Sequence, residues 1–136
     1  MSRPPTKNRI LCVDDHLETR EVLAAIFDRA GYEVVSCATA TEGLSLAARL
    51  DFDLYLFDVN LPDGTGLDLA RRVRALDTRT PLVFLSASAY PDDIEAGMKV
   101  GAQAYIVKPM SMDHLLETVG RRLYCEKYCE ARKLGV

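Results

Sequence analysis

The residues of this sequence that could do chemistry are polar side chains that follow short apolar runs. They are two adjacent acids, a third acid, a hydroxyl and an ammonium group: Asp14, Asp15, Asp58, Ser86 and Lys108. Three carboxylates that meet in one crevice repel one another, so protons, a cation or a nearby ammonium group must neutralise them. A hard cation fits best, because magnesium prefers carboxylates, a carbonyl and waters, and often shares its shell with phosphate oxygens. We therefore expect a Mg²⁺ site, with Mn²⁺ as the alternative ion.

The remaining polar groups suit a phosphoryl group. A serine hydroxyl and a lysine ammonium opposite a metal-bound carboxylate can hold its three oxygens, and an aspartate can itself be the nucleophile that forms an acyl phosphate. Each residue also has a structural interpretation: Asp14 and Asp15 as acids of a helix start, Asp58 as a turn residue, Ser86 as a strand end bonded to its own backbone, and Lys108 as an exposed lysine. Separate structural roles that happen to fall at the ends of four strands explain the pattern less well than one shared site does.

Apolar runs that alternate with segments of helical period predict a parallel sheet with crossover helices. The predicted strands are Ile10–Val13, Glu33–Cys37, Leu54–Asp58, Leu82–Ser86 and Ala104–Val107. Right-handed crossovers leave few topologies, and a doubly wound α/β sheet of order 2-1-3-4-5 is the common one. In that order ligands bind beyond the carboxyl ends of the first and third strands, where the polar residues lie.

Five helices are predicted from apolar stripes and end signals. They are a stripe from Val22 to Ala30 that ends at Gly31, a segment capped by Thr39 and Glu42 that runs to about Leu50, a stripe from Leu67 to Leu76, a segment that starts after Pro91-Asp92-Asp93 and stops at Gly101, and a stripe from about Ser111 to Leu123. The arginines Arg71, Arg72, Arg74 and Arg79 alternate with acids, so we interpret them as a solvated face.

Length and composition limit the class of protein. A chain of 136 residues with 49% hydrophobic residues predicts one domain, and a net charge of −3 gives no broad attraction to nucleic acid or anionic membranes. The longest wholly apolar run, Val22–Phe27, is far shorter than the roughly 20 residues that span a bilayer. No secretory signal follows the basic segment Arg3–Arg9. We expect a cytoplasmic protein without membrane insertion.

Other site motifs fit less well. Cys12 and Cys37 lie in apolar runs and are predicted to be buried thiols. Cys125 and Cys129 are four apart on a predicted helix, but no second pair accompanies them, so structural zinc is disfavoured and their role is open. The segment from Asp58 lacks calcium-loop residues at its fifth, sixth and twelfth positions, and Gly64-Thr65-Gly66 lacks the third glycine of a dinucleotide fingerprint.

Four stretches together closely resemble the receiver domain of two-component response regulators, from about Arg9 to Leu123. They are Cys12-Val13-Asp14-Asp15-His16, Leu56 to Gly66, Leu85-Ser86-Ala87, and Gly101 to Pro109. The resemblance implies a flavodoxin-like (CheY-like) fold, with an N-terminal extension at 1–8, a receiver domain at 9–124 and a helical extension or linker at 125–136. It implies a phosphorylation-activated signalling switch that catalyses only its own aspartyl phosphorylation and dephosphorylation.

The resemblance also assigns roles to individual positions. These are Asp58 as phosphoacceptor, Asp14, Asp15, Asp58 and the backbone carbonyl of Asn60 as Mg²⁺ ligands, Ser86, Ala87 and Lys108 as the phosphoryl-binding residues, Ser86 and Tyr105 as the switch, and Pro109 after a cis peptide bond.

The implied partners are a sensor histidine kinase or histidine phosphotransfer protein and, through the fourth helix, fifth strand and fifth helix, a downstream protein or an output domain. A phosphorylation-linked dimer is left open, and direct binding of nucleic acid or membrane is not expected. The chain is either a stand-alone receiver or part of a longer regulator or hybrid kinase. The alternative function is a magnesium-dependent phosphatase of the haloacid-dehalogenase type, whose first strand carries Asp-x-Asp where this sequence has adjacent Asp14-Asp15.

Overall fold

A five-stranded parallel sheet forms the centre of the computed structural model, which describes residues 7–133, with side chains to residue 123. Its strands are β1 (Arg9–Val13), β2 (Glu33–Cys37), β3 (Leu54–Phe57), β6 (Leu82–Ser86) and β7 (Ala104–Val107). The order β2-β1-β3-β6-β7 confirms the predicted doubly wound α/β topology. Two short strands absent from the prediction, β4 (Asn60–Leu61) and β5 (Gly64–Thr65), form an antiparallel pair in the loop after β3.

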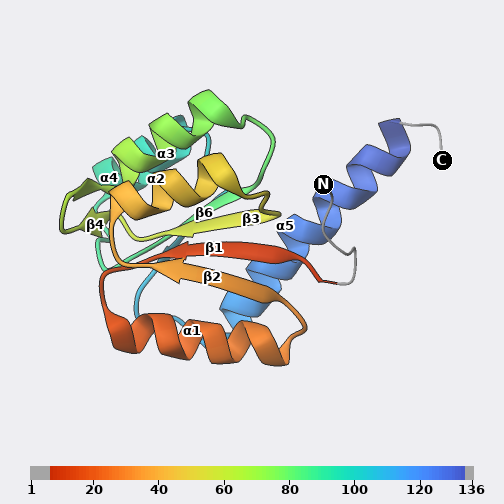
Figure 1. Cartoon of the computed structure of the whole chain (residues 1–136), viewed down its shortest axis with the longest axis horizontal. Helices are drawn as coiled ribbons and strands as arrows, with labels where there is room; N and C mark the ends of the chain where they lie inside the picture. Colours follow the sequence, from red (N-terminus) through yellow and green to blue (C-terminus); the bar gives the residue numbers. More distant parts are fainter. Residues whose placement is uncertain (1–6, 134–136) are drawn as a thin grey trace.

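Helices cover both faces of the sheet. They are α1 (Leu17–Arg29), α2 (Ala40–Arg49), α3 (Gly66–Leu76), α4 (Pro91–Lys99) and α5 (Met112–Lys133). Figure 1 shows α1 and α5 on one face and α2, α3 and α4 on the other. This arrangement requires the central strands to be apolar on both faces, which explains their uninterrupted hydrophobic runs.

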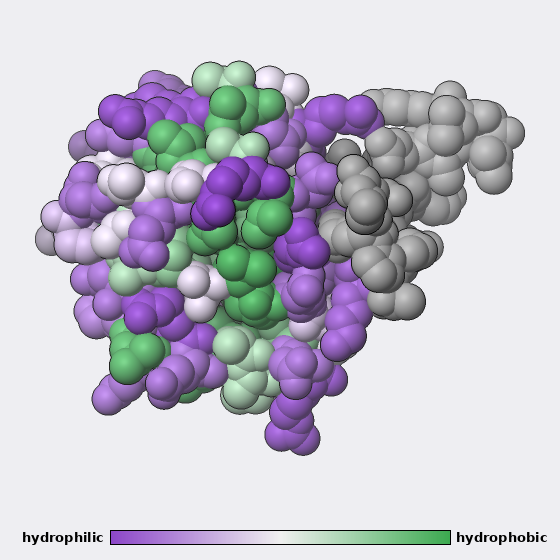
Figure 2. Space-filling model, in the orientation of Figure 1, coloured by the Kyte–Doolittle hydropathy of each residue, from purple (hydrophilic) through white to green (hydrophobic). Residues whose placement is uncertain are grey.

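The core has two halves, one on each face of the sheet. Successive side chains of a strand point to opposite faces, so Ile10 and Cys12 pack in the half beneath α1 and α5, while Leu11 and Val13 pack in the half beneath α2 and α3. The edge strand β2 is less covered. Figure 2 shows a narrow hydrophobic band in the middle of a mostly hydrophilic face, where the sheet lies between α2 and α1.

The predicted helix ends agree with the structure where the sequence carries a cap. The hydroxyl of Thr39 accepts a hydrogen bond from the backbone N–H of Glu42 at 3.1 Å, at the start of α2. Gly31 follows α1 with a φ of 91°, in the left-handed region that glycine adopts without a steric penalty. The caps set where each helix begins or ends relative to the strand ends.

Three residues of the predicted apolar stripes are exposed, so their assignment to a core-facing stripe was wrong. Val22 on α1 and Leu76 on α3 are more than half exposed, and Ala30 is exposed too. Ala30 is the C-cap residue of α1, and Leu76 is the last residue of α3. The middle of each stripe is buried as predicted, including Leu23 on α1 and Val73 on α3.

The interpretation of Arg74 as part of a solvated face was also wrong. Its side chain is half-buried, and its guanidinium donates hydrogen bonds to the carbonyl oxygens of Thr80 at 2.7 Å and Gly101 at 3.0 Å. It also donates to the side-chain oxygen of Gln103 at 3.3 Å. The long arginine stem lets the charged head reach these loops from α3.

Some predictions lie outside the described part of the chain. The placement of residues 1–6 and 134–136, and of the side chains of Cys125 and Cys129, is not described, so the predicted extensions stay predictions and the role of these cysteines stays open. The backbone of α5 is helical as far as Lys133. Among the described residues, no helix is long and apolar enough to span a bilayer.

Candidate functional site

The predicted polar residues meet at one edge of the sheet. In the parallel register Val13 lies beside Phe57, and Ser86 lies beside Val107. The residues that follow these strand ends, Asp14, Asp58 and Lys108, therefore leave the sheet at the same edge. This register explains how residues 94 positions apart in the sequence come into contact.

Lys108 forms an ion pair with two buried carboxylates. Its Nζ lies 2.8 Å from Oδ2 of Asp14 and 3.3 Å from Oδ2 of Asp58. Asp14 is 2% exposed and Asp58 is 5% exposed, whereas the Lys108 side chain retains 19%. Without this ammonium group the two carboxylates would face each other in a poorly solvated crevice.

The electrostatics of the site follow from burial and from these contacts. Burial raises the pKa of Asp58 above its ordinary value, and the neighbouring charge of Lys108 only partly offsets this effect. Burial acts to lower the pKa of Lys108, but its hydrogen bond to Asp14 and the charges of Asp58 and Asp14 outweigh burial, so the pKa is raised. Lys108 is therefore a permanent cation at neutral pH.

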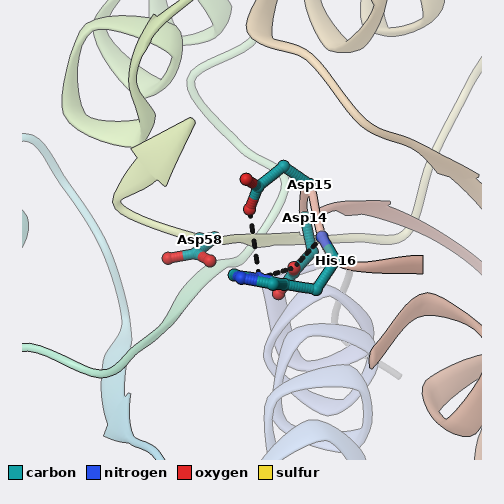
Figure 3. Close-up of side chains that lie close together, drawn as sticks. All are labelled: Asp14, Asp15, His16 and Asp58. Atoms are coloured by element: carbon teal, nitrogen blue, oxygen red, sulfur yellow. Dashed lines mark hydrogen bonds and ion pairs between the residues drawn. The ribbon is translucent and has the colours of Figure 1, made fainter. Parts of the chain in front are cut away.

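His16 joins the acidic cluster, and the sequence-based prediction did not include it among the site residues. Its Nδ1 lies 3.2 Å from Oδ1 of Asp14 and 3.1 Å from Oδ1 of Asp15, and its backbone N–H donates to Oδ1 of Asp14 at 2.9 Å. Figure 3 shows the imidazole across the two carboxylates, with Asp58 beside it. The only signal in the sequence was its position directly after Asp14 and Asp15.

The loop after β3 holds Asp58 through its backbone. Oδ1 of Asp58 accepts a hydrogen bond from the backbone N–H of Asn60 at 3.2 Å. Gly66 passes so close that a Cβ there would lie 2.0 Å from the carbonyl oxygen of Asp58, so only glycine fits. Gly66 N–H donates to the carbonyl of Val59 at 2.7 Å. The sequence-based prediction missed the role of Gly66, which becomes visible only when the two chain segments are placed together.

A second contact of this loop fixes it to a neighbouring helix. The carboxylate of Asp63 accepts hydrogen bonds from the backbone N–H groups of Ala40 at 2.7 Å and Thr41 at 2.9 Å, at the N-terminus of α2. The Thr41 hydroxyl donates to the same carboxylate at 2.6 Å. These hydrogen bonds lower the pKa of Asp63 to about 2, and they tie the Asp58 loop to α2.

The donor set suits a hard divalent ion. Ligand atoms of Asp14, Asp15, His16 and Asp58 all lie within 4.8 Å of one another. Three of these residues are carboxylates, which are ligands that Mg²⁺ prefers, and the half-exposed position of Asp15 leaves room for water ligands. Asn60, whose carbonyl was predicted as a further ligand, lies two residues after Asp58 at the start of β4.

The predicted phosphoryl-binding residues are Ser86, Ala87 and Lys108, at the ends of β6 and β7. Ser86 is fully buried, and its hydroxyl accepts a hydrogen bond from the backbone N–H of Ser88 at 3.1 Å. Ala87 and Lys108 line one cavity of about 580 Å³ together with Pro109, and the Lys108–Pro109 peptide bond is cis. The cavity is open to solvent and adjoins the ion pair.

Tyr105 on β7 packs against its neighbours. Its hydroxyl donates to the carbonyl oxygen of Ser88 at 3.0 Å, and its ring lies 6.0 Å from that of Phe84, centre to centre. A Cβ on Gly97 would lie 3.1 Å from the ring, so a larger residue at this position of α4 would require the tyrosine to shift by a few tenths of an ångström. Ser88 links both predicted switch residues, since it bonds to Ser86 and to Tyr105.

Comparisons with known proteins agree with this geometry. The family model of the response regulator receiver domain matches residues 10–120. The uncharacterized transcriptional regulatory protein YkoG of Bacillus subtilis is 36% identical over 113 residues, which is 83% of this chain and 50% of that protein. The crystal structure of a CheY-like response regulator receiver domain protein from Methanospirillum hungatei has a TM-score of 0.87 at 33% identity, and the match covers 90% of this chain and 98% of that one.

A further solved structure bears on the metal. The receiver domain of the sensor histidine kinase PA1611 from Pseudomonas aeruginosa, described with a magnesium ion coordinated in the active site cleft, has a TM-score of 0.80 at 28% identity. The match covers 86% of this chain and 98% of that one. Among the first curated relatives that it matches, this chain spans only 16% to 57% of their length. The similarity therefore concerns the domain, and not the longer proteins.

Proposed function

The chain belongs to the response regulator receiver domain family, and from this premise we propose that it is a signalling switch phosphorylated on Asp58. Receiver domains are generally signalling switches of two-component systems and not enzymes of the ordinary kind. The observation that carries the proposal is the bridge of Lys108 between the buried carboxylates of Asp14 and Asp58. The ammonium group of Lys108 lies where the negative charge of a phosphoryl group on Asp58 would have to be neutralised.

Asp58 is a better phosphoacceptor than its two neighbours. Both oxygens of Asp14 are engaged, Oδ1 by His16 and Oδ2 by Lys108 at the shorter distance of 2.8 Å. Asp15 is partly exposed and lies beside His16. Asp58 directly follows the central strand β3, and its Oδ2 is only 3.3 Å from the ammonium group. A small outward movement of Lys108 frees this oxygen for nucleophilic attack.

In the proposed reaction an oxygen of ionised Asp58 attacks the phosphorus of a phosphohistidine. The O–P bond forms, the P–N bond breaks, and the imidazole of the donor leaves with the electron pair of that bond and takes up a proton. Lys108, the hydroxyl of Ser86 and the backbone N–H of Ala87 bind the oxygens of the transferred group. Water later hydrolyses the acyl phosphate and resets the switch.

A divalent metal ion is part of the proposal because the phosphoryl group adds charge to an already anionic crevice. Asp14, Asp15, Asp58 and the backbone carbonyl of Asn60 would hold it. These residues would place a divalent ion where it could neutralise negative charge on the transferred oxygens. Lys108 would then balance only the remaining charge.

The proposed phosphoryl donor is a sensor histidine kinase or a histidine phosphotransfer protein. We place the output surface on α4, β7 and α5, because Tyr105 lies on β7 and is linked to Ser86 through Ser88. The partner that reads this surface is a downstream protein or an output domain, and a second phosphorylated copy is the further candidate. A cytoplasmic location stays a prediction.

Mass spectrometry after incubation with acetyl phosphate and Mg²⁺ tests the proposal. We expect one added phosphoryl group on the wild-type protein, none on Asp58→Asn, and none in excess chelator. A label that persists on Asp58→Asn would contradict the assignment. No observation favours the haloacid-dehalogenase alternative, which predicts sustained turnover of a phosphate ester such as p-nitrophenyl phosphate.

A further inference from the structure

The imidazole of His16 has no part in the proposed phosphoryl transfer, yet it lies within the acidic cluster. Its side chain is 68% exposed, and Nδ1 nevertheless lies close to both Asp14 and Asp15. His16 is also the N-cap residue of α1, but its side chain makes no capping hydrogen bond. Capping of α1 therefore does not explain the position of the imidazole.

The backbone around His16 is held from two sides. Its own N–H donates to Oδ1 of Asp14 at 2.9 Å, and a guanidinium N–H of Arg20 donates to the backbone carbonyl of Asp14 at 2.8 Å. Arg20 lies on α1, one turn after the loop that carries His16. The loop is thus fixed through both the carboxylate and the backbone carbonyl of Asp14. The imidazole of His16 points at the acidic cluster (Figure 3).

The distances fit a shared ion. Two neighbouring ligands of an octahedral ion with bonds of about 2.1 Å are about 3.0 Å apart, and two opposite ligands are about 4.2 Å apart. His16 Nδ1 lies 3.2 Å from Oδ1 of Asp14 and 3.1 Å from Oδ1 of Asp15. Asp58 belongs to the same set, whose four ligand atoms all lie within 4.8 Å of one another, close to the separation of two opposite ligands.

We propose that Nδ1 of His16 is a nitrogen ligand of the divalent ion in this site, and that the site consequently favours later first-row ions such as Co²⁺ over Mg²⁺. An imidazole nitrogen strengthens the binding of these ions, whereas Mg²⁺ and Mn²⁺ suit oxygen ligands and Mg²⁺ retains its waters. The inference rests on the proposed metal site and adds one ligand to it. It predicts that the preference for Co²⁺ over Mg²⁺ is larger with His16 than with three carboxylates and a carbonyl alone.

Isothermal titration calorimetry with each metal salt separately tests the preference. We expect His16→Ala and His16→Asn to weaken Co²⁺ binding by about tenfold or more, and to weaken Mg²⁺ binding by less than about threefold. Asparagine retains a hydrogen-bond donor near the position of Nδ1 but has no imidazole nitrogen. His114→Ala is the matched control, because His114 is the other histidine of the chain and is exposed on α5.

Pulsed electron paramagnetic resonance of the Mn²⁺ complex gives a direct readout of the ligand. We expect a ¹⁴N coupling typical of a bound imidazole in the wild type and in His114→Ala, and no such coupling in either His16 variant. Persistence of the coupling in His16→Ala, or an unchanged Co²⁺ affinity, would overturn the proposal. Thermal unfolding without metal shows whether each variant is folded.

The two proposals fail in distinguishable ways. If acetyl phosphate labels Asp58 of the wild-type protein but Mn²⁺ shows no ¹⁴N coupling, the ligand role of His16 is wrong and the proposed function stands. If the coupling is present and depends on His16 while Asp58 is never labelled, the metal site stands and the proposed function is wrong.

Discussion

The ammonium group of Lys108 neutralises two carboxylates that the fold removes from water. Asp14 and Asp58 are almost completely buried, and the Lys108 side chain is itself mostly covered. Removing one partner of a buried ion pair leaves an uncompensated charge, which costs far more than the pair contributes. Loss of the Lys108 ammonium group would therefore leave both buried carboxylates without this cation.

We expect Lys108→Ala to lower the free energy of unfolding by about 3–5 kcal/mol at pH 7 in the absence of divalent ions. The measurement is urea denaturation in chelator. Lys99→Ala is the control, since its pair with Glu95 is exposed on α4 and is worth about 0.3–0.5 kcal/mol. A loss as small as that of the control would show that the site tolerates two unpaired carboxylates.

Asp58→Asn is expected to stabilise the apo protein at neutral pH. Because the pKa of Asp58 is raised in the folded state, the ionised form is destabilising above that pKa, and protonation relieves the cost as the pH falls. The gain from Asp58→Asn should thus be largest at pH 7 and shrink as the pH falls through the raised pKa towards the unfolded value. Thermal unfolding between pH 7 and pH 4 measures this trend, and a gain that grows on acidification would contradict it.

At the scale of elements, the site depends on how the loop after β3 is attached. The loop contains β4 and β5, passes Gly66 against the carbonyl of Asp58, and is tied to the N-terminus of α2 by Asp63. An acid at a helix N-terminus satisfies free backbone N–H groups and interacts favourably with the helix dipole. Asp63 does not belong to α2 but to the loop after β3. The same hydrogen bonds therefore cap α2 and hold the Asp58 loop in place.

Asp63→Asn tests this attachment through its pH dependence. The pKa of Asp63 is lowered to about 2, below the ordinary value of 3.8, so its stabilising effect is complete above the ordinary value and is lost as the pH falls through about 2. We expect the variant to be less stable than the wild type at pH 5 to 7, with the difference vanishing towards pH 2. Asp68→Asn, which removes an exposed pair with Arg71 on α3, is the control and should change little. Equal losses for both variants would contradict a specific role of Asp63.

At the scale of the whole molecule, the phosphoryl site and the proposed output surface share the loop between β6 and α4. Ser88 in this loop donates its N–H to Ser86 and accepts at its carbonyl the hydroxyl of Tyr105. A phosphoryl group that draws the Ser86 hydroxyl towards Asp58 would compete with the Ser88 contact. The two states differ in whether the Ser86 hydroxyl contacts Ser88 or the phosphoryl group. A ligand shifts an equilibrium only when it contacts the two states unequally, and the Ser86 hydroxyl makes such an unequal contact.

We expect the ring signals of Tyr105 in nuclear magnetic resonance spectra to shift when a beryllium fluoride mimic occupies Asp58 in the presence of Mg²⁺. The shift should be lost in Ser86→Ala, which keeps the buried volume nearly unchanged but has no hydroxyl. Tyr32 on the opposite side of the sheet, packed against Phe27, is the internal reference. An unchanged Tyr105 environment at full occupancy would place the output elsewhere.

The layers of the fold, and the edge of the sheet that carries the chemistry, could be predicted from the sequence alone. Runs such as Leu54–Phe57 are apolar at every position because both faces of a central strand are covered, and polar residues appear only where the strand leaves the core. Since parallel strands end at one edge, Asp14, Asp58 and Lys108 had to converge there. Local sequence patterns were sufficient for this prediction, because each pattern indicates either a buried segment or the end of a strand.

Contacts that no local sequence pattern encodes could not be predicted and became visible only in the fold. The imidazole of His16 is placed by the loop before α1, the need for glycine at Gly66 arises from the carbonyl of Asp58, and the guanidinium of Arg74 binds Gly101 from 27 residues away. Each depends on the position of two chain segments relative to each other, to within about 1 Å, which packing sets and hydrophobic periodicity does not encode. The exposure of Val22 and Leu76 has the same cause, because the width of the arc that a helix buries depends on what packs against it.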